Sequence, residues 1–160
     1  MDGRLALIGC YLFVVQQLAG VNVINFYSHQ IFANSASHEV SSLLTLCMGG
    51  FDLLSIGISF TLFQYMRLKN LYLIGIFGVV ALLGYIGAGV WYHNSWVSST
   101  GVFGYMFLFQ ISLGPLTWVI VNQIVPSELM NLPVATHWIM TLIIGLFFPP
   151  MNKWVGTPNV

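Results

Sequence analysis

Four carboxamide side chains lie within ten residues of one another near the start of the chain, in a stretch that is otherwise apolar. The four are Gln16, Gln17, Asn22 and Asn25. A carboxamide both donates and accepts hydrogen bonds, and leaving one unsatisfied in an apolar medium is costly. The amides therefore either contact a polar ligand in a cavity or cross-link neighbouring helices.

The spacing of these amides indicates that the segment is not a simple lipid-facing helix. At about 100° per residue the four side chains circle the helix instead of forming one stripe, so a straight helix in lipid would leave some of them unsatisfied. Gly20 lies among them and weakens the helix at that point. Discontinuous helices of this kind recur at transporter binding sites.

Two later segments also place polar groups inside apolar runs. Asp52 lies midway in TLCMGGFDLLSIGIS, with no Lys or Arg in any apolar run to pair with it. Such a carboxyl indicates a functional site by default, and the alternative is a carboxyl that faces a water pocket and has no role. Gln110 and Trp118 are eight residues apart and face roughly the same way, while Pro115 should kink or open the helix between them. Amides beside an indole ring suit a ligand with many hydroxyl groups.

Catalysis and metal binding find no support in the residue pattern. The four histidines show no metal-ligand spacing, and no nucleophile lies near a base. We therefore expect neither an enzyme nor a metal or cofactor site. Cys10 and Cys47 lie in apolar runs and are interpreted as buried free thiols.

The composition places the chain in a membrane. Of its 160 residues 58% are hydrophobic and 5% charged, whereas soluble domains carry about 25% charged residues. The formal net charge is zero, so no nucleic-acid partner is expected. A helix needs about 20 residues to cross the hydrocarbon core. Five segments are long enough, approximately Leu5–Phe32, Val40–Phe63, Leu71–Trp91, Val102–Val125 and Leu132–Met151.

The basic residues near the span ends predict the orientation of the chain. Arg4, Arg67 and Lys69 fall on one side of a five-span arrangement, and only Lys153 falls on the other. The positive-inside rule then predicts a cytoplasmic N-terminus, although the sequence does not indicate which membrane. The third span also carries Ala81, Gly84 and Ala88 on one face, where we expect close helix packing.

Three motifs, taken in order, resemble one family. QQLAGVN followed by FYSHQIF resembles the seventh helix of the sugar porter family of the major facilitator superfamily, the facilitative glucose transporters. GPLTWVIVNQIVP resembles its tenth helix, and THWIM resembles the asparagine–tryptophan step of its eleventh. The chain therefore resembles helices 7–11 of a twelve-helix all-α fold, a partial C-terminal half without the first six helices and the last one.

This resemblance implies which residues contact a substrate. Asp52 falls near a position where the family commonly has Asn, and Gln110 where many members have Glu. The implied substrate-binding residues are Gln16, Gln17, Asn22, Asp52, Gln110 and Trp118. Secondary or gating positions are Asn25, Phe26, Tyr27 and Trp138.

The resemblance implies transport of a hexose-like monosaccharide across a lipid bilayer by alternating access, together with an N-terminal half. Some of the family's charged signatures are missing, since FQYMRLKN follows the second span and Gln123 and Met130 replace charged residues after the fourth. These departures leave open a non-transporting remnant or regulatory fragment of a transporter. A transporter of another polyhydroxylated solute is a further alternative.

Overall fold

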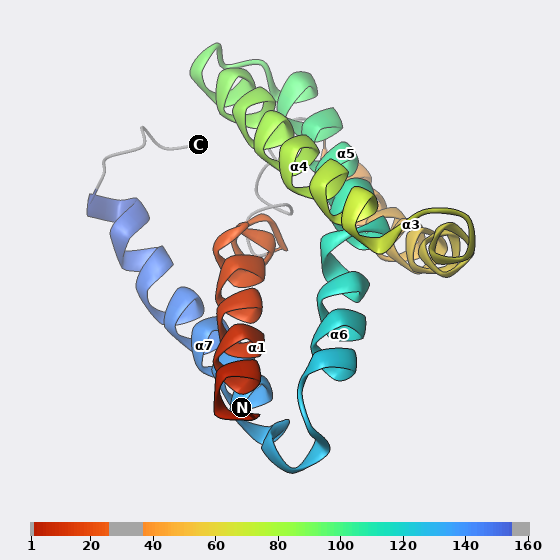
Figure 1. The fold of residues 1–160 in the computed structure, drawn as a ribbon. Coiled ribbons are helices and arrows are strands. Elements are labelled where there is room, and N and C mark those ends of the chain that lie inside the picture. Colours follow the sequence, from red (N-terminus) through yellow and green to blue (C-terminus); the bar gives the residue numbers. More distant parts are fainter. Residues whose placement is uncertain (1, 26–36, 155–160) are drawn as a thin grey trace. The chain divides into compact units, whose positions relative to one another are not determined.

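The computed structural model describes residues 2–25 and 37–154, and all of its regular elements in these ranges are helical (Figure 1). The helices are α1 (Asp2–Leu18), α3 (His38–Tyr65), α4 (Leu68–Trp91), α5 (Ser95–Ile111), α6 (Leu113–Ile124), η1 (Ser127–Leu129) and α7 (Asn131–Trp154). Within the described residues five helical spans are long and apolar enough to cross a membrane, which confirms the predicted number. The chain divides into two compact units.

The first unit contains α1, η1, α7 and the part of α6 from Leu116 onward. In it α1 lies beside α7 (Figure 1). Gly9 on α1 permits this close approach, because a Cβ atom there would lie 2.9 Å from side-chain carbons of both Pro133 and Val125. The apolar core of this unit is formed by Ala6, Phe13, Val121 and Val125.

The second unit contains α3, α4, α5 and the start of α6. Its α4 and α5 pack along their length, and α3 packs against α5. Gly75 on α4 lies directly against Ser112, since a Cβ atom at Gly75 would clash with the Ser112 Oγ atom. The Ser112 hydroxyl cannot easily move aside, because it donates to the Leu108 carbonyl.

The prediction of the packing face of the third span is wrong. Ala81, Gly84 and Ala88 are exposed on α4 among the described residues, and no atom lies within 4 Å of a Cβ built at Gly84. The close contacts fall at Gly75 and Gly89, which at about 100° per residue lie on roughly the opposite side of the helix. Small residues mark both faces of α4, so their spacing alone did not identify the one that packs.

Pro115 interrupts the fourth span, as its sequence predicted. The span opens at Ser112, whose φ of −129° and ψ of −90° are not helical, and α6 begins directly afterwards. Pro115 falls in the first turn of α6, where backbone N–H groups have no helical partner to lose. The Ile111 carbonyl, four residues before Pro115, accepts a hydrogen bond from the buried Ser59 hydroxyl of α3 at 3.2 Å.

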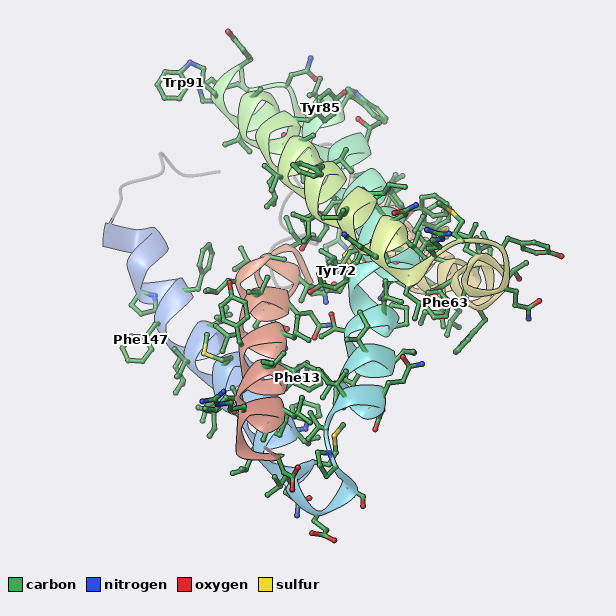
Figure 2. All side chains as sticks on the ribbon, viewed as in Figure 1. Phe13, Phe63, Tyr72, Tyr85, Trp91 and Phe147 are labelled. Carbon is green, nitrogen blue, oxygen red and sulfur yellow. The ribbon has the colours of Figure 1, made fainter. Side chains whose placement is uncertain are left out.

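The outer surfaces of the helices are strongly apolar. Trp91 and Phe147 project from α4 and α7 in Figure 2, and both are exposed. In the last span only 6% of the most apolar window is buried, so nearly all of it is available to lipid or to further helices. Cys10 and Cys47 are free thiols as expected, but neither is fully buried, since Cys10 is half-buried on α1 and Cys47 is exposed on α3.

The contact at Gly75 provides a stability test. Gly75→Ala should lower the free energy of unfolding by about 1–3 kcal/mol, because the new methyl group meets a fixed Ser112. Gly84→Ala is the matched control on the same helix. It should leave stability unchanged or raise it, since its methyl group enters open space and alanine favours the helix.

The measurement is unfolding in mixed detergent micelles, followed by circular dichroism for both variants. Equal stability of the two variants would contradict the assigned α4–α5 contact.

Candidate functional site

The first span is broken at the glycine that lies among the amides. Helix α1 ends at Leu18, residues 19 and 20 form a turn, and residues 21–25 are helical again. Gly20 has a φ of +92°, in the left-handed region that glycine adopts at little cost. This confirms the predicted weak point of the segment.

The break brings two of the predicted amides together. Residues five apart on a continuous helix point about 140° away from each other, yet the Asn22 Nδ2 atom donates a hydrogen bond to Gln17 Oε1 at 2.5 Å. Because the turn at Gly20 redirects the chain, the Asn22 side chain reaches back to the end of α1.

Gln17 is the centre of a buried polar network in the first unit. Its side chain is 2% exposed. Its Nε2 atom lies 2.9 Å from Nδ1 and 3.2 Å from Nε2 of His137 on α7, so it contacts both nitrogens of the imidazole ring. Gln17 thus links α1, α7 and the segment after the break through one side chain.

Aromatic rings surround the imidazole of this network. The ring centroids of Phe13 and Trp118 both lie 5.1 Å from that of His137, in edge-to-face arrangements. The Trp138 ring lies 5.2 Å from the same imidazole. Phe13, labelled in Figure 2, also contacts Trp118 at 4.6 Å and is fully buried. The buried polar network therefore lies beside several aromatic rings. This combination suits a ligand with both hydroxyl groups and C–H faces.

The remaining predicted residues of this region differ in their surroundings. Gln16 is 3% exposed and therefore enclosed within the unit. Trp138 is 62% exposed, so only part of its indole packs against His137. Asn25 is exposed at the end of the helical segment after the break. The predicted gating residues Phe26 and Tyr27 lie outside the described residues.

The other predicted polar residues pair in the second unit. The Asp52 carboxyl on α3 lies near the Gln110 side chain on α5. Its Oδ1 atom is buried and has no hydrogen-bond partner among residues 2–25 and 37–154. Gly114 leaves room for the side-chain Oε1 atom of Gln110, which would lie 3.0 Å from a Cβ atom at position 114. A carboxylate oxygen without a partner can accept one further hydrogen bond from a hydroxyl group.

A cavity adjoins the Gln17 network. It has a volume of about 260 Å³ and lies in the first unit. Its lining residues are Gln17, Leu18, Gly20, Val23, Ile143, Ile144, Phe147 and Phe148. Gln17 is the one carboxamide in this lining, so the cavity is apolar apart from its contact with the network.

Two residues of the site were not predicted from the sequence. Phe13 was not singled out in its apolar span, and His137 was noted among the four histidines and in the THWIM motif without a role in the site. No group of three or more metal-ligating side chains exists in the described part of the chain. The available signal for His137 was its position beside Trp138 in an apolar helix, where a polar ring needs a partner.

The fold and the site define an all-α, multi-pass membrane protein with amides and aromatic rings inside its spans. The sequence matches the Sugar (and other) transporter family over residues 3–160. The chain therefore belongs to that family, which confirms the resemblance read from its motifs.

Individual relatives are similar along almost the whole chain. It is 26% identical to the Glucose transporter GlcP of Staphylococcus epidermidis, with 97% of this chain and 37% of the relative covered. It is 27% identical to the D-xylose-proton symporter of Escherichia coli, with coverages of 91% and 31%. The Facilitated trehalose transporter Tret1 of Aedes aegypti is 25% identical, with coverages of 94% and 20%. The chain spans about a third of the first two relatives' length.

The break at Gly20 gives a second test. Gly20→Ala should destabilise the protein by about 1–2 kcal/mol, because an alanine backbone is strained in the left-handed region. Steric clash is not the cause, since nothing lies within 4 Å of the added methyl group. Gly3→Ala, also in open space but without a positive φ, should not destabilise it.

Thermal unfolding in detergent measures both variants. A Gly20→Ala protein as stable as the Gly3→Ala control would refute the broken geometry.

Proposed function

We propose that this chain is part of a transporter that moves a hexose-like monosaccharide across a membrane by alternating access. The observation that carries the proposal is the buried Gln17 network, in which the Gln17 carboxamide contacts Asn22 and His137 and the His137 ring contacts Trp118. A neutral amide of fixed orientation can exchange hydrogen bonds with sugar hydroxyls. Family membership supports the same class of solute.

The substrate class follows from the chemistry of the proposed contacts. They are amides, one carboxyl and indole rings, which together serve a neutral molecule with several hydroxyl groups. We assign Gln16, Gln17, Asn22 and Trp118 to substrate binding on this basis. Asp52 and Gln110 are proposed as further contacts, since the Asp52 Oδ1 atom retains capacity for a hydroxyl donor.

We also propose that these helices act as part of a C-terminal half and require a six-helix N-terminal half. The glucose transporter and the xylose–proton symporter that match are about three times as long as this chain. We propose that the N-terminus faces the cytoplasm. Arg4, Arg67 and Lys69 lie on the same side of the five-span arrangement as the N-terminus, and basic residues favour the cytoplasmic side. Asn25, Phe26, Tyr27 and Trp138 are proposed as secondary or gating positions.

Uptake into liposomes tests the transport function. A transporter assembled from this chain and an N-terminal half should take up labelled hexose saturably, and unlabelled hexose should compete. Liposomes that contain this chain alone should show no more flux than empty vesicles, because one half cannot expose a site alternately to two sides. No saturable uptake by the assembled protein would favour a non-transporting role.

Single substitutions to alanine test the site. Gln17→Ala in the assembled transporter should weaken hexose binding about 5- to 150-fold, because it removes a buried hydrogen-bonding group worth about 1–3 kcal/mol. Trp118→Ala should also weaken binding, through loss of the ring surface. Gln123→Ala is the matched control, since this glutamine is exposed on α6.

Equilibrium binding of labelled hexose measures all three variants. Equal affinities for Gln17→Ala and Gln123→Ala, in folded protein, would remove Gln17 from the site.

A further inference from the structure

We propose that the turn between α4 and α5 inserts into the headgroup region of the bilayer and fixes the depth at which these two helices lie. This aromatic turn, residues 91–96, carries Trp91, Tyr92 and Trp96. Its partner is the boundary between lipid headgroups and hydrocarbon, on the membrane side opposite the turn between α3 and α4. This interaction is independent of the proposed solute.

The three rings of the aromatic turn are exposed. Trp91 is 80% exposed, Tyr92 76% and Trp96 69%. Trp91 projects from the end of α4 in Figure 2. Each ring combines an apolar body with a polar N–H or O–H group, and such side chains are enriched where a membrane meets water. The rings of the aromatic turn therefore form a surface that fits this boundary.

The backbone of the aromatic turn is held by hydrogen bonds, so the rings have a fixed place on the helices. The Tyr92 N–H group donates to the Ala88 carbonyl at 2.9 Å, and the Asn94 N–H group donates to the Gly89 carbonyl at 2.8 Å. The Asn94 side chain accepts from the Val97 N–H group at 3.3 Å and caps α5. The rings therefore move together with α4 and α5.

Close packing next to the turn joins the two helices. Gly89 on α4 lies against Ser98 on α5, because a Cβ atom at Gly89 would clash with the Ser98 backbone nitrogen and hydroxyl group. Farther along the pair, a Cβ atom at Gly101 on α5 would clash with the Ile86 side chain on α4. The two helices thus form one hairpin, and rings that are held at one depth in the bilayer set the depth of both helices.

The composition of the aromatic turn limits its depth from both directions. His93 and Asn94 are exposed beside the rings, and their polar groups need water or headgroups as partners. The rings would expose large apolar surfaces if the turn stood in water. No Lys, Arg, Asp or Glu occurs at residues 91–96, so no charged side chain holds the turn in the aqueous phase. The headgroup boundary suits both kinds of side chain.

The length of α4 places the turn at the same depth. Arg67 directly precedes α4 and Lys69 lies in its first turn, and both are exposed. Basic side chains at a span end extend to the headgroups. The 24 residues of α4 extend over about 36 Å at 1.5 Å per residue, or about 34 Å with a tilt of about 20°. The hydrocarbon core is about 30 Å thick, so Trp91 at the far end lies just beyond it.

Fluorine NMR of the assembled transporter in lipid nanodiscs tests the proposed depth. The protein is labelled with 5-fluorotryptophan, and each signal is assigned by its loss in a Trp→Phe variant. One sample contains lipid with a nitroxide beside the headgroup, a second contains lipid with a nitroxide at the chain end, and a third contains a water-soluble gadolinium chelate. The signals of Trp91 and Trp96 should be broadened most by the headgroup label.

Three other results would contradict this depth. Strongest broadening by the gadolinium chelate would place the turn in water, and strongest broadening by the chain-end label would place it in the hydrocarbon core. Weak broadening by all three agents would mean that protein covers the rings. Each of these results would overturn the inference.

Two double variants test whether the rings fix the depth. Trp91→Ala with Tyr92→Ala removes two rings, and the broadening of the Trp96 signal should then shift away from the headgroup label. Trp91→Tyr with Tyr92→Trp keeps two amphipathic rings in exchanged order, and the Trp96 signal should behave as in the original protein. Both side chains are exposed, so the helix packing should persist, and circular dichroism checks it. A Trp96 signal that is the same in both double variants would show that the rings do not fix the depth.

Discussion

Hydrocarbon offers no hydrogen bonds, so the polar groups in these spans depend on partners that the protein itself supplies. Gln17 shows how far this constraint extends, because its two ends are bonded to residues from two different segments. The position of α7 beside α1 is therefore specified by a polar contact as well as by the apolar core around Phe13. Apolar packing alone specifies such positions weakly, since lipid tails are as apolar as leucine.

The same constraint governs where the helices break. Breaking a helix in a membrane frees backbone groups, and each one needs a new partner. At Pro115 the Ile111 carbonyl is freed, and the buried Ser59 hydroxyl bonds to it from another helix. At Gly20 the break turns the Asn22 amide back toward Gln17. Each break thus occurs where a polar side chain is available within its own unit.

The sequence predicted the spans well, because apolar length is a property of each segment by itself. It also predicted both breaks, since glycine and proline act on their own backbone. It did not predict partners between helices. Ala81, Gly84 and Ala88 suggested a packing face that is exposed, and the contacts fall at Gly75 and Gly89 instead. Likewise, Gln17 and His137 are 120 residues apart, and nothing in either segment indicates that they meet.

Neutral amides suit a substrate that must be released as readily as it is bound. A charged side chain would have to be desolvated in the membrane, and each hydrogen bond to it would be stronger, at about 1.5–3 kcal/mol. A neutral hydrogen bond contributes about 1 kcal/mol, so several are needed for specificity and none alone traps the proposed substrate. The aromatic contact between Phe13 and Trp118 involves neither amide, so this part of the core stays in place while such hydrogen bonds form and break.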